Sequence, residues 1–383
     1  AEWDKKIEAF DADLKELTDN PPEFPDYCMA VRDLAEPSDC AVRIRGEVQQ
    51  KGDVVPRGVP SLFDLQQTAE PAKPGSGRSV LADWLVDDAN PLTARVAVNR
   101  IWQHLFGRGL VETPDNFGRM GKRPSHPELL DWLAARFKNN GWSIKQSIRN
   151  IVLSRTYRLA SSHSAKNDES DPANNLLWRA PVKRLDAESL RDGMLHVSGE
   201  LELTPPEGSV IASFKDSEFN DRIHPSAEQL SSTHRSVYLP VARYWVPDVL
   251  HEFDFADPSL VVGKRTERTM ASQSLFLMNS QFVTDRATEI AKQIVDQPED
   301  DRAATAFRKI LLRDPTTEES TRLAAFVRGL SDGAPADNSE PAGSTGNDTT
   351  IESGNTPNMD ALEAAWQATC QTLLMTAEFR YVP

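Results

Sequence analysis

The sequence predicts a mostly α-helical protein: a multi-helix core with orthogonal or bundle-like packing, a small β-hairpin, and short strands in irregular segments rich in proline and glycine. Apolar residues recur at spacings of three and four over long stretches, which is the period of a helix that packs on one face. Capping patterns open several of these stretches, as in Ser143 with Gln146 and Thr316 with Glu319. Many of the 26 prolines and 19 glycines fall in the segments between them.

The bulk properties limit the classes of partner. A chain of 383 residues exceeds the usual size of one core, so we expect two packed subdomains or one domain with large excursions. The formal net charge of −15 argues against nucleic acid and anionic membrane surfaces as partners, because both need clustered lysine and arginine. No run approaches the ~18 apolar residues of a membrane span, so we expect none.

Three cysteines are too few for a disulfide framework, and neither CxxC nor CxxCH occurs. We therefore expect no cofactor in this chain and no c-type haem site. Cys28 and Cys40 flank a predicted hairpin whose register puts the two thiols ~13 Å apart, beyond disulfide reach. Whether they are bridged stays open. Cys370 lies in an apolar helical pattern and is expected in a core.

The N-terminal quarter is expected to contain a helix, a hairpin and a connector. In residues 1–20, which would end a preceding region, the apolar positions recur at spacings of four and three, so an amphipathic helix is predicted that needs a partner surface. Residues 21–78 are typical of a β-hairpin, turning near Glu36 and Pro37, followed by an extended connector.

Residues 79–200 are predicted to form a helical core subdomain. "SVLADWLVD" gives a short helix, and Asn90 is a good N-cap for the next. "SHPE" predicts a capping box that begins with Ser125, and "NNG" ends the helix that follows it. After a polar loop, Asp186 is expected to cap another helix.

The C-terminal half is predicted to be less regular at first. Residues 201–330 begin with an irregular segment, followed by a strand at "RSVYLPV", one long helix over 272–295 and two further helices. The composition of 331–358 predicts a disordered insert. Residues 359–383 are expected to form a C-terminal helix that packs on 272–330.

One polar cluster accompanies the helix predicted over 92–106. On a helical wheel Arg95 and Asn99 lie at the edge of the apolar face, and we expect them half-buried. Arg100 and His104 form a second i,i+4 pair on the opposite side. The full cluster is Arg95, Asn99, Arg100, His104, Asp115, Asn116, Arg119 and His126.

Two interpretations of this cluster are open. The residues could converge on an anionic or polyhydroxylated ligand, because an arginine fork suits carboxylate or sulfate and amides suit hydroxyls. Alternatively, Arg95 and Asn99 satisfy carbonyls of the long loop that follows the helix. His104 and His126 have no second ligand at metal spacing, which favours surface or capping roles.

Two further clusters are candidates. In "VKRLDAESLRDG", Arg184, Glu188, Arg191 and Asp192 have the spacing of ion pairs along one helix face, and the two arginines could instead bind a ligand. "HEFDFADP" supplies imidazole and carboxylate ligands without the EF-hand or HExxH pattern, so no metal is expected. If one were bound, its ligands would be His251, Glu252, Asp254 and Asp257.

Several phrases resemble a known family when they are taken together. They include "GDVVPRG", "NPLTARVAVNRIWQHLFGRGLVETPDNFGRMGKRPSHPELLDWL", "WSIKQSIRNIVLSRTYR", "RLDAESLRDGML", "SLFLMNSQFV" and "AWQATCQTLLMTAEFRYV". The chain resembles, over roughly residues 27–383, the C-terminal domain of unknown function of planctomycete-type cytochrome c proteins, called the PSD type or domain-of-unknown-function family 1553.

The resemblance implies a setting for the chain. In that family the domain follows an export signal, a cytochrome c module and a second uncharacterised domain. We therefore expect an extracytoplasmic, periplasm-like location, haem c in another domain of the parent protein, and those domains as partners. The resemblance supplies no catalytic residues.

The leading functional hypothesis is a non-haem module of a multidomain c-type cytochrome that binds a partner domain or a polar, anionic, carbohydrate-like ligand. One alternative is an enzyme domain that acts on polysaccharide or sulfated sugar, with catalytic candidates Asp115, His126 and Glu188. Another is a purely structural assembly module. Whether the chain is an enzyme stays open. The ligand-binding candidates are Arg95, Asn99, Arg100, His104, Asp115, Asn116, Arg119, Arg184, Arg191 and Arg235.

Overall fold

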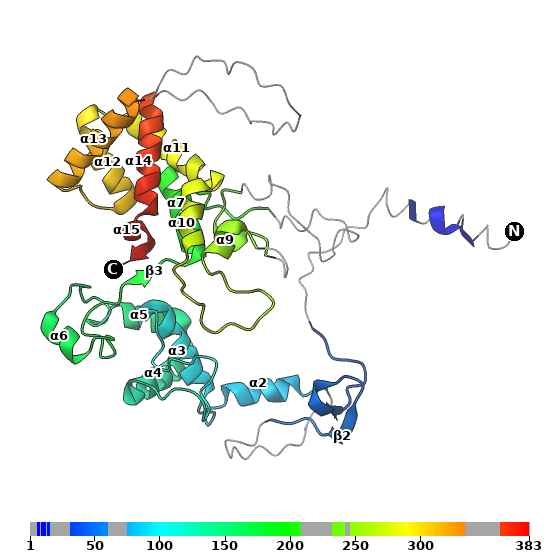
Figure 1. Ribbon diagram of the computed structural model, residues 1–383. Coiled ribbons are helices and arrows are strands. Elements are labelled where there is room, and N and C mark those ends of the chain that lie inside the picture. Colours follow the sequence, from blue (N-terminus) through cyan, green and yellow to red (C-terminus); the bar gives the residue numbers. More distant parts are fainter. Residues whose placement is uncertain are drawn as a thin grey trace. The chain divides into compact units, whose positions relative to one another are not determined.

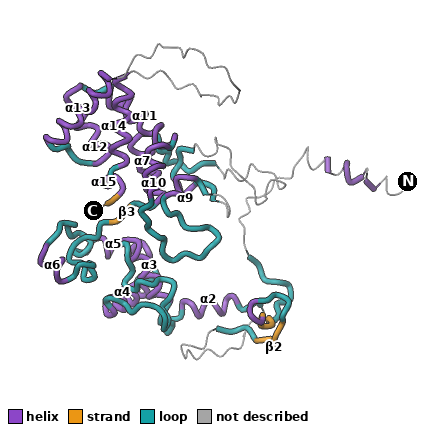
Figure 2. The backbone as a smooth tube through the Cα atoms, viewed as in Figure 1, coloured by secondary structure: helices purple, strands orange, loops and turns teal. Residues whose placement is uncertain are grey.

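The computed structural model is mostly helical, with two small two-stranded antiparallel sheets among the described residues, as predicted (Figures 1 and 2). The chain divides into two compact units, Ala1–Thr93 and Ala94–Pro383. The finer division predicted from the sequence stays a prediction. The structure describes residues 6–7, 9–12, 14–15, 31–59, 75–207, 232–241, 246–333 and 361–382.

The first unit contains the hairpin, in a different place from the one predicted. Strand β1 (Cys40–Arg43) pairs antiparallel with β2 (Lys51–Val55) across the turn of η1 (Ile44–Gly46), where Arg45 and Gly46 have positive φ. The prediction of a turn near Glu36 and Pro37 is wrong, since residues 31–39 form no strand.

The rest of the first unit agrees better with the sequence. The described residues between 6 and 15 are helical, and Ile7, Phe10 and Leu14 on this helix are exposed. The expected short helix is α2 (Arg78–Val86). Cys40 is a free, exposed thiol, whereas Cys28 lies outside the described residues.

Three helices at the start of the second unit form one core. They are α3 (Thr93–Phe106), α4 (Pro127–Asn139) and α5 (Ile144–Val152), and α3 ends in a stack of Trp102 on Phe106. Asn90 accepts hydrogen bonds from two backbone N–H groups at the start of α3, as an N-cap should. The core residues are Ala94, Val98, Trp102, Phe106, Leu110, Val111, Leu130, Leu133, Ala134, Phe137 and Ile151.

The caps of α4 and α5 differ in how well the sequence predicts them. Ser143 caps α5 and accepts from the N–H of Gln146, as predicted. The prediction that Ser125 opens a capping box is wrong, because α4 begins at Pro127 and its N-cap is His126. Ser125 instead donates its backbone N–H to Leu110 O at 2.8 Å, so it serves the preceding loop.

Asn99 is fully buried and holds that loop against α3. Its Nδ2 donates to Val111 O at 3.0 Å, and its Oδ1 accepts from Val111 N at 2.8 Å. A Cβ at Gly109 would lie 2.5 Å from Val111 O and 2.8 Å from Asn99 Nδ2, so only glycine fits there. Asn99 thus satisfies loop backbone groups, the second of the two interpretations of this cluster.

The second core is built around α14 (Ala361–Met375), which contacts α10, α11, α12 and α13 (Figure 1). Cys370 is fully buried in it. The small sheet of β3 (Lys183–Arg184) and β4 (Tyr381–Val382) joins the end of the chain to the segment before α7. The other elements are α6 (Ala165–Ser170), α7 (Ala187–Ser198), η5 (Ser236–Tyr238), α9 (Asp248–Glu252), α10 (Ala271–Asn279), α11 (Gln281–Val295), α12 (Glu299–Leu311), α13 (Thr317–Gly333) and α15 (Ala377–Arg380).

The single long helix predicted over 272–295 is wrong, because Ser280 interrupts it with an extended backbone (φ −70°, ψ 129°). The Gln371 side chain on α14 donates to Leu277 O and Met278 O, both at 2.9 Å. These carbonyls at the end of α10 are satisfied by α14 instead of by a continued helix. The predicted insert at 331–358 lies almost entirely outside the described residues.

Two neighbouring side chains on α7 hold the segment 232–238. Arg191 is 2% exposed and donates to His234 O at 2.9 Å and to Ser232 O, while Asp192 accepts from both the N–H and the hydroxyl of Ser236. Burial lowers the pKa of Arg191, and Asp192 opposes this. The strand predicted at "RSVYLPV" is wrong, because residues Ser236–Tyr238 form the 3₁₀ turn η5.

The glycine at 109 provides a test of the α3 loop contact. Gly109→Ala should destabilise the protein by roughly 1–3 kcal/mol, because the new methyl overlaps backbone and the buried Asn99 amide. Gly329→Ala, in the helix α13 with open space around it, should stabilise by about 0.5–1 kcal/mol. Urea unfolding of both variants measures the difference, and equal effects would contradict the assigned role of Gly109.

An ion-pair network at the second core predicts a pH dependence. Arg313 bonds to both Glu319 and Glu378, and Glu319 also caps α13 with Thr316, as the sequence predicts. The Arg313 hydrogen bond lowers the pKa of Glu319 from 4.5 to about 2. Its stabilising contribution is therefore complete above pH 4.5 and is lost as the pH falls toward about 2. Thermal melting at pH 2 to 6 should show a shallower loss for Glu319→Gln than for the wild type, and parallel curves would refute the assignment.

Candidate functional site

A cavity of about 350 Å³, here called the basic cavity, lies where α3, the β3–α7 segment and residues 253–267 meet. Its lining contains five arginines and lysines and one histidine against three carboxylates, although the chain as a whole carries a net charge of −15. The cations are Arg100, His104 when protonated, Lys183, Arg184, Lys264 and Arg265, and the carboxylates are Asp186, Asp254 and Glu267.

Arg184 is the most buried of these cations. Its side chain is 7% exposed, and its Nη1 donates to Arg268 O at 2.5 Å and to Asp254 Oδ2 at 3.4 Å. Its Nη2 is buried with no hydrogen-bond partner. A buried donor without a partner costs roughly 1–3 kcal/mol, so this guanidinium has hydrogen-bonding capacity that the described residues do not use.

Lys183 links the cavity to the C-terminus of α3. Its Nζ donates to His104 O at 2.6 Å and to Leu105 O at 3.3 Å, which places a positive charge on carbonyls that the helix leaves unsatisfied. Burial lowers the pKa of Lys183, while the charges of Asp186 and Glu267 oppose the change.

Two cations and one histidine on the wall are uncommitted. Arg100, His104 and Lys264 are exposed, and their side chains have no hydrogen bond or ion pair with any described residue. Arg265, in contrast, is neutralised by a bidentate pair with Glu188, at 2.5 and 2.8 Å, and this hydrogen bonding raises the pKa of Arg265. The lining therefore combines exposed, uncommitted basic side chains with the buried, partly satisfied Arg184.

The wall formed by residues 253–267 is fixed at its middle by α3 and its loop. Asp115 Oδ2 accepts from Gly263 N at 2.9 Å, and Gln103 Nε2 donates to Gly263 O at 3.1 Å. A Cβ at Gly263 would lie 1.8 Å from Asp115 Oδ1, so glycine is required for this approach.

The C-terminal end of the same wall is fixed by Asp254 and Gln273. Asp254 has a positive φ of 64° and accepts from Arg268 N at 2.9 Å. The buried Gln273 donates from Nε2 to Glu252 O at 2.9 Å and to Arg268 O at 3.0 Å. These hydrogen bonds hold the start of the wall, at Glu252 and Asp254, against its end, at Arg268, although the wall contains no helix or strand.

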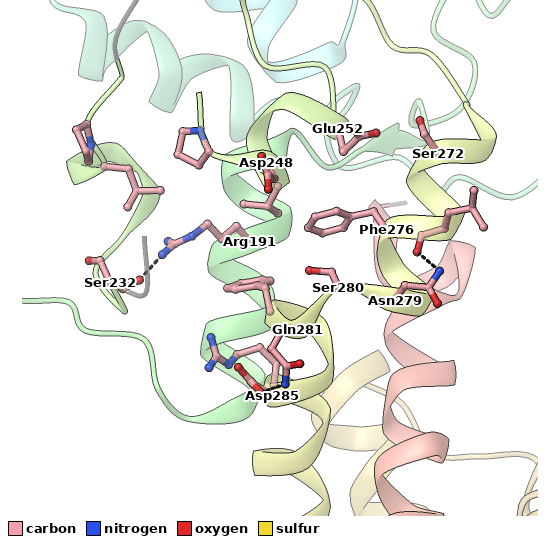
Figure 3. A pocket seen from close by; sticks show the side chains of 17 residues that line it. Arg191, Ser232, Asp248, Glu252, Ser272, Phe276, Asn279, Ser280, Gln281 and Asp285 are labelled. Carbon is pink, nitrogen blue, oxygen red and sulfur yellow. Dashed lines mark hydrogen bonds between the residues drawn. The ribbon is translucent and has the colours of Figure 1, made fainter. Parts of the chain in front are cut away.

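A larger cavity of about 890 Å³ lies beside α7, α9, α10 and α11 (Figure 3). Phe276 and Phe282 contribute aromatic surface, and the acidic residues Asp248, Glu252 and Asp285 lie around it. Its arginines are already engaged: Arg191 with the 232–236 segment, and Arg286 with Glu200 at 2.6 Å. The charged side chains of this cavity that are not arginines are therefore all acidic, and Asp285 among them accepts from Gln281 Nε2 at 2.7 Å.

The structure separates the first predicted cluster. Of its eight members, Arg100 and His104 line the basic cavity. Asn99 and Asp115 hold backbone, Arg95 pairs with Asp131 at 2.7 Å, and His126 bonds to the Ser125 hydroxyl. Asn116 accepts from Gly118 N in its own loop, and Arg119 is exposed outside the basic cavity, as is Arg235.

The second predicted cluster forms different ion pairs from those expected. The spacing favoured pairs along α7 that involve Glu188, but Glu188 pairs with Arg265, and Arg184 and Arg191 bond to segments distant in sequence. Arg184 lines the basic cavity and Arg191 the larger one. The catalytic candidates Asp115 and Glu188 thus each have a structural partner.

The four residues named as ligands in case a metal were bound have other partners. The His251 ring lies 3.7 Å from the carboxylate of the neighbouring Glu252, and Asp254 holds Arg184 and Arg268. Asp257 accepts from Ser259 N. Within the described ranges no three histidine, cysteine or acidic side chains are grouped so that they could hold a metal ion.

Sequence reasoning missed Lys183, Lys264, Arg265 and the need for Gly263. The stretch "VVGKRTER" contained a usable signal, because it concentrates Lys264, Arg265 and Arg268 around a glycine in an acidic chain. Its link to Arg100 and His104, some 160 residues earlier, has no signature in the sequence.

The contact between Gly263 and Asp115 can be tested with a double-mutant cycle. Gly263→Ala should cost roughly 1–3 kcal/mol of unfolding free energy, because the methyl displaces the carboxylate that holds the wall. In an Asp115→Ala background the same change should cost much less, since the obstructing group is gone. Additive costs would mean that the two residues do not interact.

A family model described as "Protein of unknown function (DUF1553)", PSD1, matches residues 77–327, which is more than half of the chain and includes the basic cavity. Neither curated proteins nor solved structures gave a significant match. Among the described residues no helix has the length and apolarity required to cross a membrane. The chain belongs to the DUF1553 (PSD1) family of proteins of unknown function.

Proposed function

We propose that this chain is a non-haem module that binds a small anionic ligand in the basic cavity. The observation that carries the proposal is the buried Nη2 of Arg184, which has no acceptor, in a wall with three uncommitted basic side chains. A carboxylate or sulfate provides several acceptor oxygens and suits the planar guanidinium. Sugar acids and sulfated sugars carry such groups and are the class that the sequence suggested.

The parent protein is the second part of the proposal. The resemblance to planctomycete-type cytochrome c proteins supports an extracytoplasmic, multidomain protein with haem c in another domain. Those other domains would then be the partners of this chain, and electrons would pass through the haem elsewhere. The module would contribute ligand binding.

The charges of the two cavities favour the basic one for an anion. Arg100 and Lys264 have no ion-pair partner among the described residues, whereas the arginines of the larger cavity are bonded to protein groups and its other charged side chains are acidic. An anion in the larger cavity would face Asp248 and Asp285, and like charges in a partly buried site repel it.

Calorimetric titration with sulfate, acetate and glucuronate, with glucose as the neutral control, tests the proposal. The three anions should bind and glucose should not. Arg100→Gln and Lys264→Gln should each weaken anion binding by about five- to tenfold, which corresponds to about 1 kcal/mol for a lost exposed charge contact.

The matched control is Arg119→Gln, an exposed arginine outside the cavity. It should leave the affinities unchanged. Absence of binding by all three anions, or equal weakening by Arg119→Gln, would overturn the assignment of the basic cavity.

A further inference from the structure

An apolar groove borders the basic cavity. It has a volume of about 520 Å³ and lies between α3, α4 and α5. Arg100 and His104 line both the groove and the basic cavity, so the two hollows share a border on α3. The remaining lining is apolar: Ala97, Ile101, Leu105, Phe137, Ile144 and Ile148.

From this juxtaposition we infer that the ligand is a single-chain amphiphilic anion, whose carboxylate or sulfate head is held by the basic cavity and whose alkyl chain lies in the α3–α5 groove. The inference rests on the proposed function, because it assigns the rest of the ligand whose anionic group the basic cavity binds. Arg100 and His104 mark the point where head and chain meet.

The surface of α5 supports an apolar occupant. Ile144 and Ile148 lie one helical turn apart and are 58% and 37% exposed, so two large β-branched side chains lie side by side in contact with water. Contiguous apolar surface of this kind marks a binding groove more often than isolated exposed residues do. Covering it with an alkyl chain removes that surface from water.

The dimensions and charges of the groove favour an alkyl chain. From Ala97 to Leu105 the helix α3 rises by about 12 Å, which suits a chain of medium length. The only charged or polar side chains in the lining are Arg100 and His104, at the border with the basic cavity. The head of an amphiphilic anion is therefore favoured on the side of the groove formed by Arg100 and His104, and the orientation of the ligand follows from charge complementarity.

A sugar ring would fit the groove poorly. Its hydroxyl groups would lie against isoleucine, leucine and phenylalanine side chains that offer no hydrogen bond. Burying a hydroxyl group without a partner is unfavourable. Among ligands with an anionic head, alkyl carboxylates and alkyl sulfates therefore fit the groove better than sugar acids do.

Calorimetric titration with acetate, butanoate, hexanoate and octanoate, below the concentration at which they aggregate, tests the inference on the full chain. Each methylene should tighten binding about twofold if half of its surface is buried, which compounds to roughly 60-fold between acetate and octanoate. The heat capacity change of binding should become more negative as the chain lengthens.

Two exposed positions supply matched variants. Ile148→Ser should abolish most of the chain-length dependence and leave acetate binding unchanged, because it alters only the groove. Leu330→Ser, at an exposed leucine on α13, should preserve the wild-type dependence. Circular dichroism melting of both variants shows that they remain folded.

The outcomes separate the two proposals. If acetate, sulfate and glucuronate bind but affinity does not rise with chain length, the groove is not used and only the inference fails. If Ile148→Ser and Leu330→Ser reduce the dependence equally, the groove assignment fails as well. If no anion binds at any chain length, the proposed function fails together with the inference.

Discussion

The geometry of the basic cavity depends on how residues 253–268 satisfy their backbone without a helix or a strand. A segment of this length packed on protein must pair its buried N–H and C=O groups with side chains. Asp115 and Gln103 bond to both sides of Gly263, and Asp254 and Gln273 close the segment on itself at Arg268. The positions of Lys264 and Arg265 follow from these bonds.

These same bonds join the two cores of the second unit. Gln103 and Asp115 belong to α3 and its loop, whereas Gln273 lies in the first turn of α10 in the second core. Lys183 adds a direct link from β3 to the last carbonyls of α3. The cavity is therefore a consequence of joining two cores through one irregular segment, and most of its wall residues also have structural partners.

The sequence predicted what local physics decides. Helical periodicity and caps at Asn90, Ser143, Asp186 and Thr316 are properties of neighbouring residues, and the structure confirms them. The sequence prediction failed where a side chain from a distant segment of the chain bonds to the backbone and decides the local structure. Gln371 ends α10 at a position where the apolar period continues, although it lies about 90 residues away in the sequence.

In the candidate site, too, the sequence predicted what neighbouring residues decide and missed contacts with distant segments. Arg100, His104 and Arg184 were candidates because of their charge and spacing on predicted elements, and all three line the basic cavity. Glu188 was assigned to helix-face pairs, since i,i+4 neighbours are the only partners visible in a sequence. The bidentate partner that it finds, Arg265, is 77 residues away and has a planar fork that matches a carboxylate better than a flexible neighbour does.

An anion site in a chain of net charge −15 must work at short range. The field of the whole protein repels an anion at a distance, and it is screened beyond about 8–10 Å at physiological salt. Inside the cavity the near cations dominate, because a partly buried site has a lower effective dielectric constant than water. In the proposed site, salt should therefore raise both rates, with opposite effects on affinity: it speeds association by screening the long-range repulsion, and it speeds dissociation by weakening contacts at the exposed Arg100 and Lys264. In the proposed site a contact with the buried Arg184 would be the least screened, so it would set the part of the affinity that survives in high salt.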